Sequence, residues 1–216
     1  MAAAHTRASA RGGTGTTVPG KIIFLNGASS AGKSTLARAL QARLDEPFWH
    51  YSIDHLLAAQ VLPQQRMDAG HFAWADMRPA FFEGFHRSLP ALLIAGNNLV
   101  VEHIVETRGW MDRLLSLLSP FDVFFVGVHC ELPELERREL ARGDRRIGEA
   151  RADHQVTHGF GEYDFELSTS HAYGQTSAPS STQAAEELAD KLIAAWRHRI
   201  RPGAFERMLA QAVSAH

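Results

Sequence analysis

The segment from Gly27 to Ser34 reads Gly-Ala-Ser-Ser-Ala-Gly-Lys-Ser, which sets two glycines, a lysine and a hydroxyl at fixed spacing. This is the G-x-x-x-x-G-K-[ST] pattern, in which backbone N–H groups surround the phosphates of a nucleotide. The two glycines allow the torsion angles that turn these N–H groups inward. We expect Lys33 to reach the β- and γ-phosphates and the Ser34 hydroxyl to ligate Mg²⁺. The predicted ATP-binding residues are Gly27, Ala28, Ser29, Ser30, Ala31, Gly32, Lys33, Ser34 and Thr35.

The position of this pattern distinguishes it from a glycine-rich turn that matches by chance. It follows the apolar, β-branched run Lys21–Asn26, which is typical of a buried parallel strand. It precedes Lys33–Leu44, where leucine recurs at helical spacing. A phosphate-binding loop needs this strand before it and a helix N-terminus after it, because the helix end adds positive partial charge. The position therefore favours phosphate binding.

Asp54 follows the second apolar run, Phe48–Ile53. A small-molecule kinase needs a group that orients and deprotonates the acceptor hydroxyl. In a doubly wound sheet we expect that group at the carboxyl end of a strand beside the phosphate-loop strand. Asp54 suits this role as a catalytic base. An aspartate there would serve equally well as the N-cap of a helix over His55–Gln60, so both interpretations stay open.

Glu102 lies near the carboxyl end of a third apolar run, Leu99–Ile104. An acid at this point of a P-loop protein holds Mg²⁺, usually through water. The alternative is a buried acid paired for structural reasons, although acids are rarely buried without a partner. His103 should face the opposite side of a regular strand, either toward a ligand or as a core histidine. We predict Ser34 and Glu102 as the Mg²⁺ residues.

Arginines are concentrated in Arg137–Arg146, after a fourth apolar run, Phe121–His129. In kinases, mobile arginines close over ATP and neutralise charge on the transferring phosphoryl group. The alternative is a solvated helix end whose arginines pair with nearby acids. We favour a lid. The predicted catalytic set is Asp54, Lys33, Arg138, Arg142 and Arg145.

The elements that position these residues alternate between strand and helix. The expected strands are Lys21–Asn26, Phe48–Ile53, Leu99–Ile104, Phe121–His129 and, more weakly, Asp164–Leu167. The expected helices are Lys33–Leu44, Arg78–Ala95 with a kink or split at Pro90, Arg108–Leu118 capped by Thr107, Glu134–Arg142, Thr182–Arg199 and a short one after Pro202. The alternation predicts an α/β fold, a doubly wound parallel sheet of about five strands with helices on both faces, of P-loop kinase type with a lid. We expect a disordered tail over residues 1–20, a P-loop kinase domain over 21–200 and a C-terminal extension over 201–216.

Composition narrows the classes of partner. The formal net charge is −2 at pH 7, and no basic stripe is visible, so nucleic acid is not an expected partner and a polynucleotide end-kinase is disfavoured. No apolar run reaches the roughly 18–20 residues of a membrane span. Cys130 is the only cysteine, which excludes an internal disulfide and a Cys-based zinc site and suggests a buried residue. These features predict a cytoplasmic protein and do not indicate its oligomeric state.

Four stretches of the chain resemble the chloramphenicol phosphotransferase family: IIFLNGASSAGKSTLARALQ, SIDHLL, FFVGVHCELPELERRELARGDR and HGFGEYDFELST. The resemblance runs from about Lys21 to Arg199. It implies ATP-dependent phosphorylation of a hydroxyl of chloramphenicol, which inactivates the antibiotic, with Asp54 as the general base. Carried over by position, it implies ATP binding by Gly27, Gly32, Lys33 and Ser34 and a lid with Arg138, Arg142 and Arg145.

The chain departs from the family pattern where an acceptor would bind. Glu102 and His103 stand where the family has two adjacent acids, and the segment after Asp54 is shorter and lacks an acidic, Gly-rich insertion. The expected function is therefore an ATP-dependent O-phosphotransferase acting on a small hydroxylated molecule, with chloramphenicol as the first named acceptor. Another hydroxylated metabolite or antibiotic is the alternative acceptor. A nucleotide-binding regulatory module is the alternative from a different class, and it would need no base such as Asp54 aimed at an alcohol.

Overall fold

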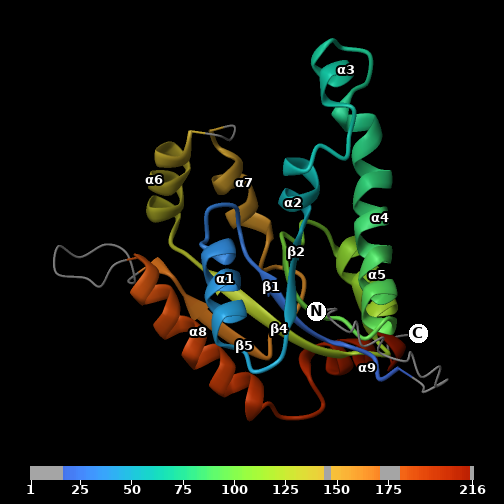
Figure 1. The fold of residues 1–216 in the computed structure, drawn as a ribbon, viewed down its shortest axis with the longest axis vertical. Helices are drawn as coiled ribbons and strands as arrows, with labels where there is room; N and C mark the ends of the chain where they lie inside the picture. Colours follow the sequence, from blue (N-terminus) through green and yellow to red (C-terminus); the bar gives the residue numbers. More distant parts are fainter. Residues whose placement is uncertain (1–16, 144–146, 171–180, 215–216) are drawn as a thin grey trace, which may run out of the picture.

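The computed structural model describes residues 17–143, 147–170 and 181–214. Five strands form one parallel sheet in the order β2-β3-β1-β4-β5. Their bounds are β1 Lys21–Asn26, β2 Phe48–Ser52, β3 Asn98–His103, β4 Asp122–His129 and β5 Phe165–Ser168. The predicted α/β fold with a five-stranded parallel sheet is confirmed (Figure 1).

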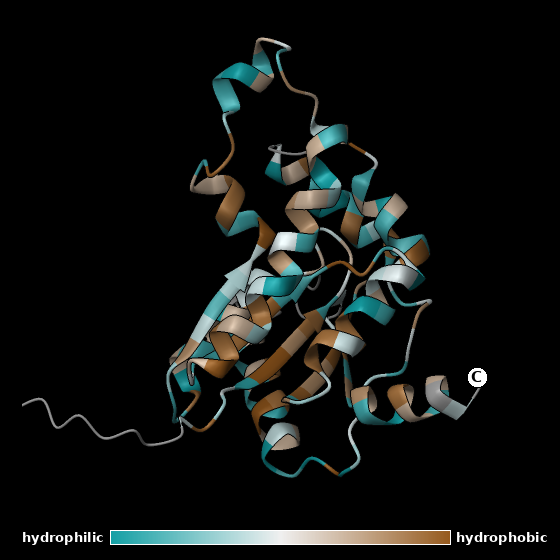
Figure 2. Ribbon diagram, turned by 90° about the vertical axis from the view of Figure 1, so that its right-hand side faces the viewer, coloured by the Kyte–Doolittle hydropathy of each residue, from teal (hydrophilic) through white to brown (hydrophobic). Residues whose placement is uncertain are grey.

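Helices cover both faces of the sheet (Figure 1). One face carries α1 (Lys33–Arg43) and α8 (Ser181–Arg197), and the other carries α4 (Trp74–Ile94), α5 (Arg108–Leu118) and α9 (Ala204–Ser214). Because side chains alternate across a strand, β1 sends Ile23 into the first core and Phe24 into the second. In Figure 2 the hydrophobic residues gather on the central strands and on the helix sides that face them.

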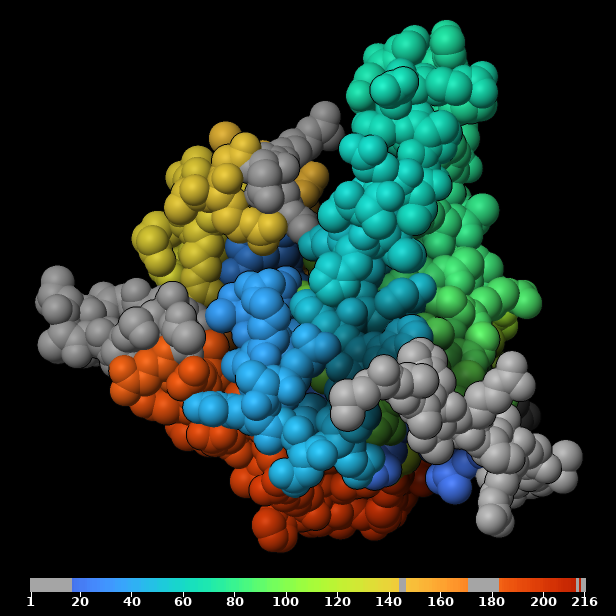
Figure 3. Space-filling model, viewed as in Figure 1, coloured from blue at the N-terminus to red at the C-terminus, as the bar shows by residue number. Residues whose placement is uncertain are grey.

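The other four helices of the described chain lie beyond the carboxyl ends of the strands (Figure 1). They are α2 (Ile53–Ala58), α3 (Gln64–Asp68), α6 (Leu132–Arg142) and α7 (Glu149–Val156). The first two form an arm beside α4, which we define as residues 53–73. We call the last two the lid helices, after the lid that the sequence predicts. Figure 3 shows the molecule hollowed between this arm and α6. Of these four, the sequence predicted α6, and it offered a helix over His55–Gln60 as one alternative near α2.

We predicted a kink or a split at Pro90; helix α4 runs through Pro90 as one element, so the split is wrong. A proline inside a helix removes a hydrogen bond and costs about 3 kcal/mol. Leu89 and Leu93 on either side of it are both 0% exposed. Full burial of a leucine contributes roughly 1.5–3 kcal/mol, so packing against the sheet offsets the cost of the proline.

Within the predicted C-terminal extension over residues 201–216, helix α9 packs onto the sheet. The α9 residues that enter the core are Ala204, Phe205 and Met208. The Asp164 carboxylate ties this helix to β4, because it accepts hydrogen bonds from the N–H groups of Ala204 (2.6 Å) and Phe125 (2.8 Å). Residues 1–16 of the expected N-terminal tail lie outside the described residues.

Three further observations concern composition. Cys130 is 6% exposed, so its predicted burial is confirmed. In residues 17–143, 147–170 and 181–214, no helix is both long and apolar enough to cross a membrane. The same residues bring together no group of three His, Cys, Asp or Glu side chains that could hold a metal ion.

Candidate active site

The loop between β1 and α1 requires its two motif glycines for different reasons. Gly32 has a φ of 86°, in the left-handed region that side chains disfavour. At Gly27 a Cβ would lie 2.5 Å from the carbonyl oxygen of Val128 on the adjacent strand β4. Ser30, with a φ of 63°, adopts the left-handed conformation without being glycine. These torsions turn the loop around a concave space at the end of the sheet.

Lys33 lies inside this loop and is only 8% exposed. Its Nζ donates hydrogen bonds to the carbonyl oxygens of Gly27 and Ala28, both at 2.7 Å. The ammonium group is therefore held within the loop by its backbone, where it can attract an anion that binds to the neighbouring N–H groups.

Glu102, at the end of β3, is the centre of a buried polar cluster and is 7% exposed. The Ser34 hydroxyl donates to its Oε2 at 2.9 Å, and His50 Nε2 contacts its Oε1. Burial alone would raise the pKa of Glu102, but the bond to His50, the charge of Lys33 and the Ser34 hydroxyl together hold that pKa below its ordinary value. Glu102 is therefore ionised, and its carboxylate and the Ser34 hydroxyl form a pair of oxygen donors that fits Mg²⁺.

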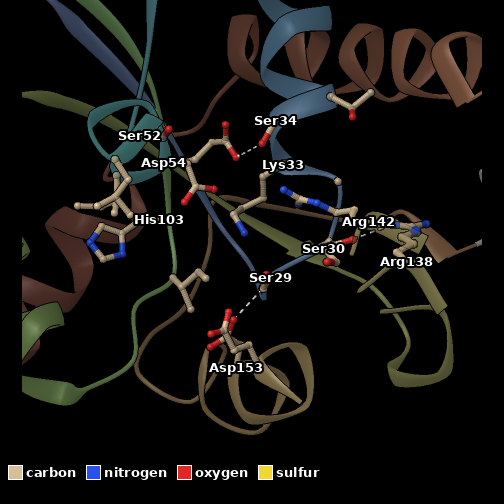
Figure 4. Close-up of a pocket in the computed structure, with 18 of the residues that line it drawn as sticks. Ser29, Ser30, Lys33, Ser34, Ser52, Asp54, His103, Arg138, Arg142 and Asp153 are labelled. Carbon is tan, nitrogen blue, oxygen red and sulfur yellow. Dashed lines mark hydrogen bonds between the residues drawn. The ribbon is translucent and has the colours of Figure 1, made fainter. Parts of the chain in front are cut away.

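Asp54 lies in the first turn of α2, and it is not the cap of that helix. The N-cap is Ser52, whose hydroxyl accepts a hydrogen bond from the His55 N–H at 3.2 Å. The capping alternative for Asp54 is therefore wrong, because the helix begins two residues earlier than expected. Asp54 is exposed, and Figure 4 shows it reaching into the part of the cavity that Lys33 also lines.

We had expected the strand that leads to Asp54 to lie beside the phosphate-loop strand, and this expectation is wrong. The order β2-β3-β1 sets one strand between them, and that strand carries Glu102. Because parallel strands all end at the same edge of the sheet, Asp54 still opens onto the cavity from one strand further away.

Arg138 links the lid helix α6 to the phosphate loop. Its Nη1 donates to the carbonyl oxygen of Ser30 at 3.3 Å, and its guanidinium also donates to Thr169 Oγ1 (3.1 Å) and to the Thr169 carbonyl (3.0 Å). Its Nε pairs with Glu134 at 2.7 Å. These contacts make Arg138 a brace for the loop in this structure.

The other predicted lid arginines differ in position. Arg142 is exposed at the end of α6 and lines the cavity (Figure 4). Arg145 lies outside the described residues. Glu139 is 3% exposed and accepts hydrogen bonds from the N–H groups of Gly148 and Ala150, both at 2.8 Å. This buried acid fixes α7 against α6, so the two lid helices are joined.

Asp153 reaches the phosphate loop from α7. Its Oδ2 accepts a hydrogen bond from the Ser29 N–H at 3.0 Å (Figure 4). A phosphate bound in the loop would use N–H groups of this kind. A carboxylate therefore engages the loop at a point where an anionic ligand would bind.

The cavity has a volume of about 960 Å³ and extends from the loop to the arm and α4. Its apolar residues on that side are Ile53, Leu57, Ala58, Trp74, Phe82 and Ile104. None of the residues that α2, α4 and the end of β3 contribute to it is a lysine or an arginine. Arg78, nearby on α4, makes a two-pronged bond to Glu106 at 2.6 and 2.7 Å, and its guanidinium stacks over Phe82. Among the described residues, this half of the cavity is therefore lined by apolar and aromatic side chains and by the acids Asp54 and Glu106, with no lining lysine or arginine.

His103 faces the side of β3 opposite Glu102, as predicted for a regular strand. Its ring stacks on Phe24, and its Nε2 lies 2.8 Å from Nε2 of His86. Burial, with some repulsion between the two rings, lowers the pKa of His103 to about 3, and burial lowers that of His86 to about 4. Both imidazoles are therefore neutral at neutral pH, with one donating the shared hydrogen bond and the other accepting it.

Sequence reasoning missed His50, Asp153, Thr169 and the pair Arg78–Glu106. A signal existed for His50, since the two-residue period of β2 puts it on the same side as the core residue Phe48. Asp153 lay in a polar stretch whose helix we did not predict. His154 and His158, four residues apart in the chain, belong to no metal-binding group of the described residues, and His158 stacks on His129.

A family model and two curated relatives indicate the same family for this chain. A family model described as chloramphenicol phosphotransferase-like protein matches residues 20–190. Two relatives from Mycobacterium tuberculosis, in strains CDC 1551 and H37Rv, are named as candidate O-phosphotransferases. Each is 33% identical over 208 residues, covering 88% of this chain and 88% of the relative.

Solved structures resemble the fold at lower identity. The Mycobacterium tuberculosis APS kinase in complex with AMPPNP and APS has a TM-score of 0.56 at 19% identity, covering 83% of this chain and 98% of that one. The Deinococcus radiodurans tunicamycin resistance protein has a TM-score of 0.54 at 18% identity, covering 80% and 95%. At these identities the likeness establishes the fold alone.

Proposed function

Because this chain belongs to the chloramphenicol phosphotransferase-like family, we propose that it transfers the γ-phosphoryl group of ATP to a hydroxyl of an uncharged small molecule. One observation carries the proposal: Lys33, the Ser34–Glu102 pair and Asp54 all line a single cavity. Binding a nucleotide for regulation would need only the first two of these. An exposed acid at the edge of the apolar half suits a reaction with an alcohol.

The proposed reaction assigns one role to each group. Asp54 accepts the proton of the acceptor hydroxyl as the acceptor oxygen forms a bond to the γ-phosphorus. The bond from that phosphorus to the β–γ bridging oxygen breaks, and ADP leaves. Lys33 stabilises the charge on the β- and γ-phosphates. Ser34 and Glu102 would hold Mg²⁺, which when bound neutralises charge on the phosphate oxygens.

The acceptor half of the cavity supports an uncharged acceptor. An acceptor with a carboxylate, phosphate or sulfate would meet Asp54 and Glu106, while Arg78 is already paired with Glu106. The apolar and aromatic lining suits a ring or a short hydrocarbon segment. Chloramphenicol is the first acceptor to test, and its phosphorylation would inactivate the antibiotic. Another uncharged hydroxylated antibiotic or metabolite is the alternative.

The test is incubation with ATP and Mg²⁺ against chloramphenicol and a panel of hydroxylated antibiotics, nucleosides and sugars, with mass detection of a product heavier by one phosphoryl group. Asp54→Asn should lower transfer by roughly 10²–10⁴-fold while ATP still binds, because only the base is lost. Lys33→Met should lower transfer by roughly 10²–10³-fold, because it removes charge stabilisation in the transition state.

A matched control is Ser52→Ala, which removes the cap of α2 and leaves Asp54 unchanged. It should cost stability, about 1 kcal/mol, without abolishing transfer. Full activity of Asp54→Asn would exclude this residue as the base. ATP binding without transfer to any alcohol would favour the regulatory module over the enzyme.

A further inference from the structure

Each oxygen of the Glu102 carboxylate has a side-chain partner, Ser34 on one and His50 on the other. The proposed reaction assigns no role to His50. We propose that His50 is a positioning residue, which fixes Glu102 in the orientation that binds Mg²⁺ beside Ser34. This inference rests on the proposed function, because it concerns the metal that the phosphoryl transfer would use. It adds a residue outside the phosphate loop and outside the strand of Glu102.

The geometry around Glu102 leaves the carboxylate little freedom. Its Oε2 accepts the Ser34 hydroxyl bond at 2.9 Å, and its Oε1 contacts His50 Nε2. The side chains of His50 and Glu102 are 7% and 8% exposed, so water is largely excluded from their contact. A buried carboxylate with a partner on each oxygen cannot rotate without breaking one bond.

The sheet explains how His50 reaches this point. On the edge strand β2, Ser52 pairs in register with Glu102, and His50 pairs with Val100. His50 is two residues before Ser52, so its side chain leaves the sheet on the same side. From there its long side chain can reach diagonally to the carboxylate of Glu102.

A second histidine lies against His50. The ring of His55, in α2, packs against it edge-on with centroids 4.3 Å apart. His50 Nε2 contacts Glu102, whereas His55 makes no hydrogen bond to that carboxylate in the described structure. The two histidines therefore form a matched pair in which only one contacts the acid.

Loss of His50 should weaken metal binding more than nucleotide binding. Groups that orient a metal ligand typically contribute 10–100-fold to metal affinity. Without His50, Glu102 would keep only the bond to the Ser34 hydroxyl. Its carboxylate could then turn away from the proposed Mg²⁺ position beside Ser34. The phosphate loop itself should be unchanged, because Lys33 Nζ is held by the carbonyl oxygens of Gly27 and Ala28 within that loop.

The experiment measures AMPPNP binding by calorimetry as a function of Mg²⁺ concentration, in wild type, His50→Leu, His50→Gln and His50→Asn. We expect His50→Leu to raise the Mg²⁺ concentration for half-maximal binding by roughly 10–100-fold, with metal-free AMPPNP binding unchanged. His50→Gln should stay within about threefold of wild type, because its amide nitrogen matches the reach of Nε2. His50→Asn, one bond shorter, should behave like His50→Leu, so the comparison holds even if the leucine variant does not fold.

The control is His55→Leu, which removes the neighbouring imidazole and leaves the bond to Glu102. Its Mg²⁺ dependence should match that of wild type. A wild-type Mg²⁺ dependence in both His50→Leu and His50→Asn would overturn the proposal, as would an equal shift in His55→Leu. Wild-type AMPPNP binding that is indifferent to Mg²⁺ would instead remove the metal site and the proposed function with it.

Discussion

Replacing Asp153 with asparagine should tighten ATP binding. The Asp153 carboxylate accepts the Ser29 N–H at 3.0 Å, so a phosphate oxygen that takes this N–H must displace it. Asparagine has the same shape and can still accept this bond through its amide oxygen. The substitution therefore removes the negative charge and keeps the contact that supports the loop.

The magnitude follows from charge and distance. Two unit charges about 5 Å apart repel by about 3 kcal/mol at an effective dielectric constant of about 20. Asp153 is half-buried and can swing toward solvent, so only part of this repulsion will be realised. We expect a gain of about 1.4 kcal/mol, which is about a tenfold lower Kd for the nucleotide.

The assay is calorimetric titration of wild type and Asp153→Asn with AMPPNP and Mg²⁺ at low and high salt. The difference should shrink at high salt, because a half-exposed charge is partly screened. Glu149→Gln is the matched control: Glu149 is on the same helix and lines the same cavity, and the described structure shows no bond from it to the loop. If Asp153→Asn binds AMPPNP no more tightly than wild type, the reasoning is refuted. If Glu149→Gln gains as much affinity as Asp153→Asn, the gain comes from the net charge of the cavity and not from the contact with Ser29.

Two further predictions concern the lid and the buried histidines. Arg142→Ala should lower kcat more than it raises the KM for ATP. Arg138→Ala should also weaken ATP binding, because Arg138 donates a hydrogen bond to the Ser30 carbonyl in the phosphate loop. The control is the exposed Arg151→Ala, and an unchanged kcat in Arg142→Ala would exclude Arg142 from the lid. The unfolding free energy should fall as pH drops from 6.5 toward 4, because unfolded histidines take up protons that His86, with a pKa of about 4, and His103, with a pKa of about 3, refuse in the native state. At pH 5 the loss should be about 2 kcal/mol for each histidine, so on the order of 4 kcal/mol together, measured by urea unfolding against a His86→Phe/His103→Phe double variant, with exposed His154→Gln as control. The same pH dependence in all three proteins would contradict the assignment.

Most of the fold could be predicted because its elements carry strong local signals. Apolar runs identified each strand to within one or two residues, and Thr107 was predicted correctly as the cap of α5, where its hydroxyl accepts the Trp110 N–H. The exceptions were short or polar elements, α2, α3 and α7, which bury little apolar surface and so leave little periodicity. The continuity of α4 through Pro90 was missed because the sequence shows the hydrogen bond that proline removes, but not the burial on the sheet that outweighs this loss.

The sequence by itself determined the phosphate loop, since Gly27, Gly32, Lys33 and Ser34 are consecutive or nearly so and their chemistry depends on local backbone torsions. It also determined that Glu102 and His103 face opposite sides of one strand. Only the tertiary structure decided which distant groups meet them. The strand order brought His50 to Glu102, and the packing of α7 brought Asp153 to Ser29. Such contacts join residues far apart in the chain, and periodicity or local propensity carries no information about their distance.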